Sequence, residues 1–391
     1  MLVLAGPTGV GKSRLAMRVA AVLGRAEIVS ADSVQVYRGL NIGSSKPSRD
    51  DCAAVRHHCL DVAGVDDDFT TATFVDLAVA AVDDVRSRGA VPLVVGGAGM
   101  YLDWLVNGRP TTAAAPRGVK ERVRAMLAED HSWTKSLARL EKVDPRYAGQ
   151  LLKNDYYRLG RALEIVETTG MPVPVGRLLP LAADGRHVMD GVVPVALTRN
   201  RLELCRQIDA RCEDMVADGL VQEVLGLLAA HPQLPSTQAG QAIGYRQTIS
   251  FIDRLVGDRY LVRSGEQMPA RSAAARRRKL FRAYVSEFQA ATRAYARRQV
   301  NWFARDASFR WINLDRLAGE CGADADATDE RVFTEAAERL ADGWRGDASH
   351  HPHENRTDAK VMRTYRPVLG RFADDATVDE IMDAISRSRP R

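Results

Sequence analysis

The sequence is poor in features that cross-link a protein or anchor it in a membrane. Its 391 residues include five cysteines, no two of which stand three positions apart, so neither a redox CxxC motif nor a zinc ribbon can be written. The longest charge-free apolar run, 90–102, is too short for a membrane span of about 20 residues. No basic segment followed by an apolar stretch precedes the first apolar run. We therefore expect a cytoplasmic protein with no membrane contact, or an organellar one if a leader is missing here.

The composition is that of a folded protein, with 46% hydrophobic and 27% charged residues. This balance excludes disorder and collagen, and the length predicts two or three domains. The formal net charge of +5 hides an uneven distribution. Residues 271–310 hold 11 Lys or Arg and 2 Asp or Glu, whereas 311–391 hold 12 and 17. A basic segment with interleaved aromatic residues favours an RNA-binding surface over a merely solvated helix face.

Strand-like and helix-like runs alternate in the first hundred residues. Apolar runs at 2–5, 27–30 and 91–95 are separated by helical patterns from Lys12 and over 73–88, which predicts an α/β fold with a doubly wound parallel sheet. We divide the chain into a P-loop core (1–112), a mostly helical insertion domain (113–185), the second part of the core with the basic helical segment (186–312), and an acidic, partly disordered tail (313–391). A short helix is expected over 378–385.

The first turn fits the P-loop pattern GxxxxGK[ST]. It reads GPTGVGKS and lies between an apolar strand and an Ala/Leu-rich helix, the context that gives the pattern meaning. Glycines let backbone N–H groups face a diphosphate, and the helix N-terminus adds its positive end. The residues predicted to bind diphosphate are Gly6, Thr8, Gly9, Val10, Gly11, Lys12 and Ser13, with Ser13 also the predicted ligand of Mg²⁺.

Two neighbouring features separate this site from an ordinary NTPase. The later apolar strand ends in Gly96 and Gly97, where a P-loop NTPase would carry an acidic residue for its metal. Asp32 follows the second strand, and the carboxyl ends of parallel strands meet at one edge of the sheet. Asp32 is therefore predicted to face the phosphates as a general base or a magnesium ligand; a helix cap is its alternative role.

Several ordered motifs resemble the tRNA dimethylallyltransferase (tRNA isopentenyltransferase) family. The resemblance runs from Met1 to about Ile312 and leaves out the tail. It is carried by GPTGVGKS (6–13), SADSVQVYRGLNIGSSKPS (30–48), HHCLDV (57–62), VPLVVGGAGMYL (91–102), DYYRLGRALEIVETTG (155–170), AIGYRQ (242–247) and TRAYARRQVNWF (292–303).

The resemblance implies a P-loop NTPase-like fold and transfer of a dimethylallyl group from dimethylallyl diphosphate to N6 of adenosine 37 in the tRNA anticodon stem-loop. The P-loop would then hold a leaving group with Mg²⁺, and Asp32 would take the proton of the exocyclic amine. Lys12, Asp32 and Arg211 are the implied catalytic residues. The implied tRNA-binding residues are Asp32, Ser33, Val34, Gln35, Ala98, Tyr157, Arg158, Arg161, Ile243, Gly244, Tyr245, Arg246 and Gln247. A monomer is the simplest expectation.

The sequence departs from the family at three of these places. Gln207 stands for the first Arg of the stretch that contains Arg211, Tyr157 stands for a Gln, and Ala98 stands for a Thr whose hydroxyl is implied to touch the reacting region. Loss of such a hydrogen bond can cost on the order of 3 kcal/mol in the transition state. Two alternatives stay open. An adenylate isopentenyltransferase, which makes cytokinin precursors from free nucleotides, would share the P-loop and Asp32 but would not need an extended RNA surface. A tRNA-binding relative with weakened catalysis is favoured by Ala98.

Overall fold

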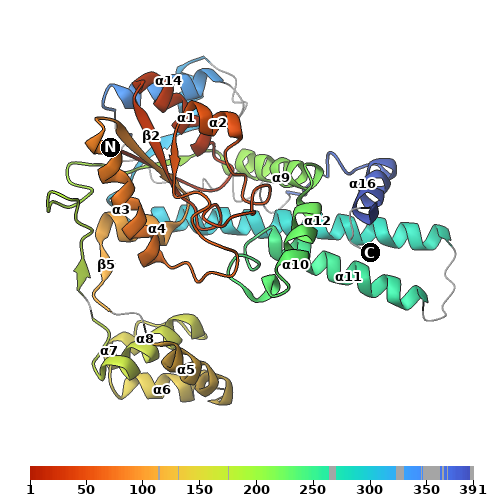
Figure 1. The fold of residues 1–391 in the computed structure, drawn as a ribbon, viewed down its shortest axis with the longest axis horizontal. Coiled ribbons are helices and arrows are strands. Elements are labelled where there is room, and N and C mark those ends of the chain that lie inside the picture. Colours follow the sequence, from red (N-terminus) through yellow and green to blue (C-terminus); the bar gives the residue numbers. More distant parts are fainter. Residues whose placement is uncertain are drawn as a thin grey trace. The chain divides into compact units, whose positions relative to one another are not determined.

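The computed structural model divides the chain into two compact units (Figure 1). It describes residues 1–112, 115–130, 132–174, 176–263, 270–322, 330–344, 346, 362, 365–367 and 369–387. Val106–Pro180 form one unit, named here the insertion unit, and the rest of the described chain forms the core unit. The insertion unit begins and ends several residues before the predicted 113–185.

The core unit is built on a six-stranded parallel sheet with the strand order β3-β2-β4-β1-β7-β8. The strands are β1 Leu2–Ala5, β2 Ala26–Ala31, β3 His57–His58, β4 Val91–Gly96, β7 Val195–Thr198 and β8 Arg310–Asn313. All residues of β1 and β7 are buried, which explains their continuous apolar sequences. The predicted doubly wound parallel sheet is confirmed, and the carboxyl ends of β1, β2 and β4 meet at one edge.

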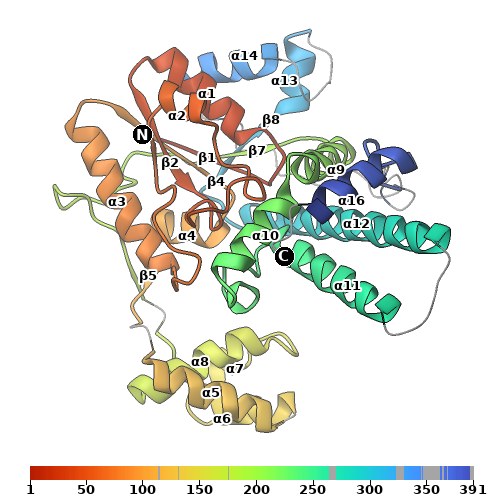
Figure 2. The ribbon, with the colours of Figure 1, turned by 45° about the vertical axis from the view of Figure 1, so that its right-hand side comes forward.

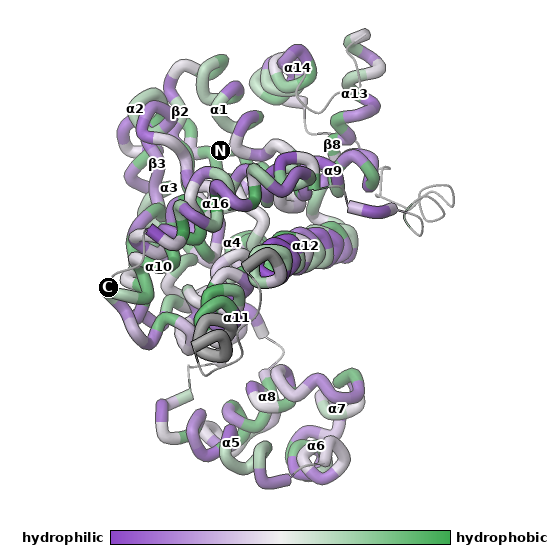
Figure 3. The backbone as a smooth tube through the Cα atoms, turned by 90° about the vertical axis from the view of Figure 1, so that its right-hand side faces the viewer, coloured by the Kyte–Doolittle hydropathy of each residue, from purple (hydrophilic) through white to green (hydrophobic). Residues whose placement is uncertain are grey.

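The helices α1 Lys12–Leu23 and α3 Thr71–Ser87 pack against this sheet, whereas α11 Tyr245–Arg263 extends away from it (Figure 2). The other helices of the core unit that precede β8 are α2 Arg49–Ala54, α4 Gly99–Asn107, α9 Arg201–Ala217, α10 Leu220–Ala230 and α12 Ala270–Phe303, with a 3-10 turn at Leu234–Ser236. Local signals set several ends: Ser48 and Asp51 form a capping box at α2, and Gly24 ends α1 in the left-handed region. None of the described helices is long and apolar enough to cross a membrane, and hydrophilic and hydrophobic residues are mixed along α12 (Figure 3).

Part of the acidic tail is an ordered piece of the core unit. β8, which straddles the predicted boundary at 312, pairs in parallel with β7 and closes one edge of the sheet. The helices α13 Leu314–Glu320, α14 Glu330–Ala341 and α16 Asp375–Arg387 follow, and α14 packs along α1. The helix predicted over 378–385 is thus present, whereas β8 was not predicted because its four residues hold only two buried side chains, Trp311 and Ile312.

The insertion unit is mostly helical, in agreement with the periodicity of its sequence. Its elements are β5 Arg109–Pro110, α5 Arg117–Asp130, α6 Trp133–Glu141, α7 Pro145–Ala148, α8 Tyr156–Thr169 and β6 Arg177–Leu178. Val119, Val123, Leu140 and Leu159 share one apolar cluster. β5 and β6 pair in an antiparallel ribbon, which brings the two ends of the unit together and moves its boundaries away from the predicted ones.

Candidate active site

The turn between β1 and α1 has the backbone of an anion-binding loop. Gly6, Gly9 and Gly11 have φ angles of 141°, 81° and 103°, which L side chains rarely adopt. A Cβ on Gly6 would also lie 2.8 Å from the carbonyl oxygen of Leu197. Gly11 caps α1 without any side-chain hydrogen bond, so the first N–H groups of the helix are left for an anion.

Two cationic side chains point into this loop from different elements. Lys12, the first residue of α1, donates from Nζ to the carbonyl oxygen of Pro7 at 2.8 Å. Arg211 in the middle of α9 donates to the Thr8 hydroxyl at 2.8 Å and to the Ser45 hydroxyl at 3.2 Å. Neither cation forms an ion pair with a carboxylate among the described residues. The tertiary fold thus brings together the two cations that the sequence analysis assigned to catalysis.

The electrostatics of this pair favour an anionic ligand. Burial, together with the positive charge of Arg211, lowers the pKa of Lys12 to about 7, and the nearby Asp32 only partly opposes this shift. Burial likewise lowers the pKa of Arg211. Two half-buried like charges with one carboxylate nearby disfavour their own ionised forms. A bound diphosphate would relieve this, because it supplies the missing negative charge.

Asp32 lies directly after β2 and is held by its own backbone. Its Oδ1 accepts from the amide N–H groups of Val34 at 2.8 Å and Gln35 at 3.3 Å, a local turn typical of aspartate. No protein donor reaches its Oδ2 in the described part of the chain. One oxygen therefore fixes the orientation of the carboxylate, and the other can accept from a ligand.

A cavity of about 1040 Å³ is lined by the P-loop, the Asp32 turn and residues of α9, α11, α12 and α14. The predicted site residues on its wall are Thr8, Gly9, Gly11, Lys12, Ser13, Asp32, Ser33, Val34, Gln35, Arg211, Ile243 and Arg246. Gly6, Val10 and Ala98 do not line it; Val10 is fully buried in the core. The cavity thus gathers most of the residues predicted to bind diphosphate and the target base.

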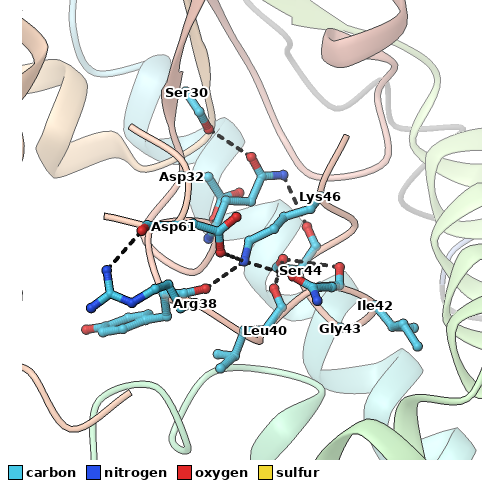
Figure 4. A network of polar contacts seen from close by, with 12 residues as sticks. Ser30, Asp32, Arg38, Leu40, Ile42, Gly43, Ser44, Lys46 and Asp61 are labelled. Atoms are coloured by element: carbon cyan, nitrogen blue, oxygen red, sulfur yellow. Dashed lines mark hydrogen bonds and ion pairs between the residues drawn. The ribbon is translucent and has the colours of Figure 1, made fainter. Parts of the chain in front are cut away.

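Gln35 connects the Asp32 turn to the loop that carries Ser45. Its Nε2 donates to the carbonyl oxygens of Ser44 and Ser45, both at 3.2 Å, and its Oε1 accepts from the Ser30 hydroxyl at 2.8 Å (Figure 4). Both N–H donors of the amide are used by these bonds. Gln35 therefore fixes the shape of the wall that holds Ser45 against Arg211.

Lys46 ties the same loop from the other side. Its Nζ donates to the carbonyl oxygen of Tyr37 at 2.6 Å, to Asn41 Oδ1 at 3.1 Å and to Asp61 Oδ1 at 2.6 Å (Figure 4). The Lys46 side chain is only 7% exposed. Three acceptors around one largely buried ammonium group give a rigid connection, so the loop is preorganised without a ligand.

The segment 243–247, predicted to contact tRNA, is divided between wall and core. Ile243 and Arg246 line the cavity, and Arg246 is exposed. Buried behind the wall are Gly244, Tyr245 and Gln247. The predicted contact with tRNA can therefore be made directly by Ile243 and Arg246, while the buried members shape the segment.

Tyr245 is fully buried and acts through Glu223 of α10. Its hydroxyl donates to Glu223 Oε1 at 2.7 Å. The Glu223 carboxylate also accepts from the amides of Asn41 and Ile42, at 3.0 and 2.8 Å. The tyrosine thereby supports the same loop as Lys46.

Ala98 occupies the capping position of α4. Its carbonyl oxygen accepts the first helical bond, from Leu102 N at 3.1 Å, and its own N–H donates to the carbonyl oxygen of Ala31 at 3.3 Å. The preceding Gly96 and Gly97 line the cavity, whereas Ala98 does not. Threonine at this position would have the geometry of a helix N-cap, so the departure from the family falls on a helix end.

Two residues of α12 belong to the site and were not assigned from the sequence. Gln299 Oε1 accepts from Thr8 N at 2.9 Å, and its Nε2 donates to the carbonyl oxygen of Gly97 at 2.8 Å. Tyr295 lines the cavity near Asp32, and its burial raises its pKa. One sequence feature points to them. Phe288, Thr292, Tyr295 and Gln299 are spaced by three or four residues, which places them on one face of a helix.

A third unassigned wall residue comes from the tail. Phe333 of α14 is 1% exposed, lines the cavity, and lies 2.7 Å from where a Cβ on Gly11 would be. The guanidinium of Arg14 lies 5.1 Å from the centre of its ring. No local pattern could have placed a residue from the acidic tail against the P-loop.

The remaining predicted residues lie on α8 of the insertion unit. Tyr157 is 71% exposed. Arg158 pairs with Asp155 and Arg161 with Glu164, and both arginines retain exposed surface. An exposed aromatic ring beside two arginines suits stacking and phosphate contact with RNA.

The residues present fit a magnesium ion that is coordinated mainly by the oxygens of a bound diphosphate. The part of the chain that the structure describes contains no group of three or more His, Cys, Asp or Glu that could hold a metal. Mg²⁺ commonly binds through one or two protein oxygens plus substrate phosphates. The Ser13 hydroxyl and the Asp32 carboxylate, which line the same cavity, could supply these oxygens.

Comparison with known sequences identifies this arrangement. Residues 35–306 match the family model described as IPP transferase. The chain is 38% identical over 315 residues to tRNA dimethylallyltransferase 1 of Citrifermentans bemidjiense, with 80% of this chain and 91% of the relative covered. It is 35% identical over 346 residues to tRNA dimethylallyltransferase 9 of Arabidopsis thaliana, with 81% and 72% covered.

Solved structures agree with the sequences. The full-length tRNA isopentenylpyrophosphate transferase from Bacillus halodurans superposes with a TM-score of 0.54 at 25% identity, covering 93% of this chain and 98% of that one. A eukaryotic dimethylallyltransferase described as acting on tRNA has the same fold, with a TM-score of 0.66 at 23% identity, covering 93% and 83%. The P-loop therefore presents Lys12 and Arg211, which have no carboxylate partner in the described chain, beside Asp32. The chain belongs to the IPP transferase family.

Proposed function

We propose that this protein is a tRNA dimethylallyltransferase, which transfers a dimethylallyl group from dimethylallyl diphosphate to N6 of adenosine 37 in tRNA. One observation carries the proposal. Lys12 and Arg211 lie at the P-loop without a carboxylate partner. The same cavity contains Asp32, whose Oδ2 is left to accept from a ligand. This arrangement provides both halves of the reaction, a place for a departing diphosphate and an acceptor for a proton.

The reaction follows from these positions. The bond between C1 of the allyl group and the diphosphate oxygen breaks while a bond forms between N6 and C1. Lys12, Arg211 and the N–H groups at the start of α1 stabilise the charge that develops on the diphosphate. Asp32 accepts the proton that N6 loses. When bound, Mg²⁺ would neutralise further charge on the diphosphate, with Ser13 as its proposed protein ligand.

The exposed basic residues around the cavity support tRNA as the acceptor. Arg246 and Arg298 line its wall, and both are exposed. Arg297 and Arg305 are exposed as well, and neither forms an ion pair with a described carboxylate. Such cations suit a phosphate backbone, and the proposed base contacts are Ser33 and Val34. Free adenine nucleotides, the alternative acceptor, would not need this extended surface.

We further propose a monomer in the cytoplasm. All five cysteines are free thiols, which agrees with a reducing compartment. Size-exclusion chromatography with light scattering tests the monomer.

The decisive experiment offers two acceptors side by side. The protein is mixed with labelled dimethylallyl diphosphate, Mg²⁺, an anticodon stem-loop containing A36 and A37, and AMP or ATP. We expect label in the RNA, and its loss in Asp32→Ala. The matched control is Asp253→Ala, which removes an exposed carboxylate of α11 outside the cavity. Label in the free nucleotide would overturn the tRNA assignment, and label in neither acceptor would make this chain a weakened relative.

A further inference from the structure

The last described residues of the chain, 365–367 and 369–387, form a segment that packs against the basic helix α12. Phe372 is fully buried with its ring 5.1 Å from that of Phe281, and α16 buries Val378, Met382 and Ile385. Figures 1 and 2 show α16 beside α12. The segment is therefore anchored by apolar contacts.

Polar contacts to α9 anchor the same segment ahead of α16. The Tyr365 hydroxyl donates to Asp209 Oδ2 at 2.6 Å. Glu213 accepts from the amides of Gly370 at 3.1 Å and Arg371 at 2.6 Å. These contacts do not involve the acidic side chains of α16, so the docking does not depend on them alone.

Two aspartates of α16 cover the first part of the basic row on α12. Arg278 donates to both Asp375 and Asp379, with Nε lying 2.8 Å from Asp379 Oδ1. Arg282 donates to Asp375 Oδ1 at 2.8 Å and to the carbonyl oxygens of Phe372 and Ala373, both at 3.1 Å. We name Arg278 and Arg282 the covered pair.

The far end of α12 has no such cover. Arg297 and Arg298 make no ion pair with a carboxylate in the described ranges, and Arg298 lines the cavity. One helix thus carries two sets of arginines that differ in their partners. The covered pair faces oxygens in carboxylate groups, which resemble the oxygens of a phosphate in charge and in hydrogen bonding.

We propose that the covered pair is a second binding surface for the RNA sugar-phosphate backbone, and that Asp375 and Asp379 occupy it in competition with RNA. This inference rests on the proposed function, in which tRNA is the acceptor. The guanidinium groups keep 26% and 30% of their side-chain surface exposed. RNA can therefore reach both arginines, but their charge-assisted hydrogen bonds to Asp375 and Asp379 offset most of the gain from a phosphate contact. The apolar anchors hold α16 in place.

The test neutralises the competing carboxylates and compares this with a matched change on the same helix. Asp375→Asn/Asp379→Asn removes the two carboxylates that contact the covered pair. Glu380→Gln/Asp383→Asn removes two exposed negative charges that contact no arginine of α12 in the described chain. The dissociation constant of a tRNA anticodon stem-loop is measured for each over a series of salt concentrations.

We expect Asp375→Asn/Asp379→Asn to bind about tenfold more tightly at low salt, with a plot of log affinity against log salt that is steeper by about one to two units, because each additional phosphate contact adds roughly 0.7 to 0.9. The matched variant should change affinity less than about twofold, since distant exposed charges are screened. Equal effects of the two variants would overturn the proposal.

A second pair of variants separates uncovering from misfolding. Arg278→Gln/Arg282→Gln should leave tRNA affinity almost unchanged in the wild-type background and should abolish the gain in the Asp375→Asn/Asp379→Asn background, a coupling that a double-mutant cycle measures. The same loss in both backgrounds would mean that the covered pair already binds RNA and would overturn the competition. Wild-type protein that binds no tRNA at all would instead refute the proposed function.

Discussion

Two groups of cations in the core unit contrast in what surrounds them. Lys12 and Arg211 lie half-buried at the P-loop with hydroxyl and carbonyl oxygens as neighbours, and partial burial lowers the pKa of each. Arg278 and Arg282 lie nearer the surface with carboxylates as partners, and those partners raise the pKa of Arg278. A half-buried cation without a counterion is costly in the free protein. Its presence indicates that a ligand completes the site, whereas the second group is already neutralised.

The largest effect is expected when a cation is removed from the P-loop group. Arg211→Gln should lower kcat/KM for dimethylallyl diphosphate by about 10²–10³-fold, the effect of losing one preorganised donor to developing charge. Arg206→Gln is the matched control on the same helix, because Arg206 is exposed and pairs with Glu203; it should change kcat/KM less than about twofold. Steady-state kinetics measures both. Similar losses in the two variants would refute the special role of the P-loop cation.

The lowered pKa of Lys12 sharpens the contrast through pH. In the free protein Lys12 is charged below pH about 7 and neutral above it, and diphosphate prefers the charged form. Affinity for inorganic diphosphate should therefore fall as the pH rises from 6 to 9, by up to about tenfold per pH unit above the pKa. Isothermal titration of wild type against Lys12→Arg checks this, because both share the ionisation of the ligand. The ratio of the two affinities should depend on pH; a constant ratio would contradict the prediction.

The lowered pKa of Lys12 also makes the free energy of unfolding depend on pH. The folded pKa lies below the unfolded value of 10.5, so the unfolded chain takes up the proton first as the pH falls. Lys12 therefore lowers the free energy of unfolding progressively between pH about 10 and 7, with the full penalty below that window. Lys12→Met should stabilise the protein at pH 7 more than at pH 10, as chemical denaturation at both values will show. Equal stabilisation at the two pH values would argue against the shift.

The two ends of α12 provide a third comparison. Arg298→Gln should weaken tRNA binding by about three- to tenfold, because one phosphate contact is lost at the cavity. Arg278→Gln should change it less than about twofold, since its charge is already matched by Asp375 and Asp379. Filter binding with the anticodon stem-loop at low salt measures both. A larger loss in Arg278→Gln than in Arg298→Gln would reverse the assignment of the two ends.

The smallest effect is expected at Ala98. If this residue caps α4, Ala98→Thr should raise the free energy of unfolding by about 1 kcal/mol and change the turnover rate less than about threefold. Ala98→Val, which has the same shape without the hydroxyl, should not stabilise the protein. A rise in rate of about a hundredfold in Ala98→Thr would instead restore the role near the reacting atoms that the family resemblance implies.

The sequence predicts those parts of the fold and site that are encoded locally. The P-loop and Asp32 are adjacent to apolar strands, and the strands alternate with helical patterns, so the sheet and the centre of the cavity could be placed. Gln299 and Phe333 could not, because α12 and α14 reach the P-loop only through tertiary packing. In the segment 243–247 the sequence could not separate residues on the wall from residues behind it, since burial there depends on α10 and α12.

The two hydrogen bonds of Gln299 set an order of events during synthesis. Gln299 joins the amide of Thr8 to the carbonyl oxygen of Gly97, so the P-loop obtains its final support from a residue made 291 positions later than Thr8. At a translation rate of about 5–20 residues per second, this support arrives roughly 15–60 s after the loop has been made. The hydrogen bonds that join the P-loop to Gly97 through Gln299 can therefore form only after α12 has emerged from the ribosome.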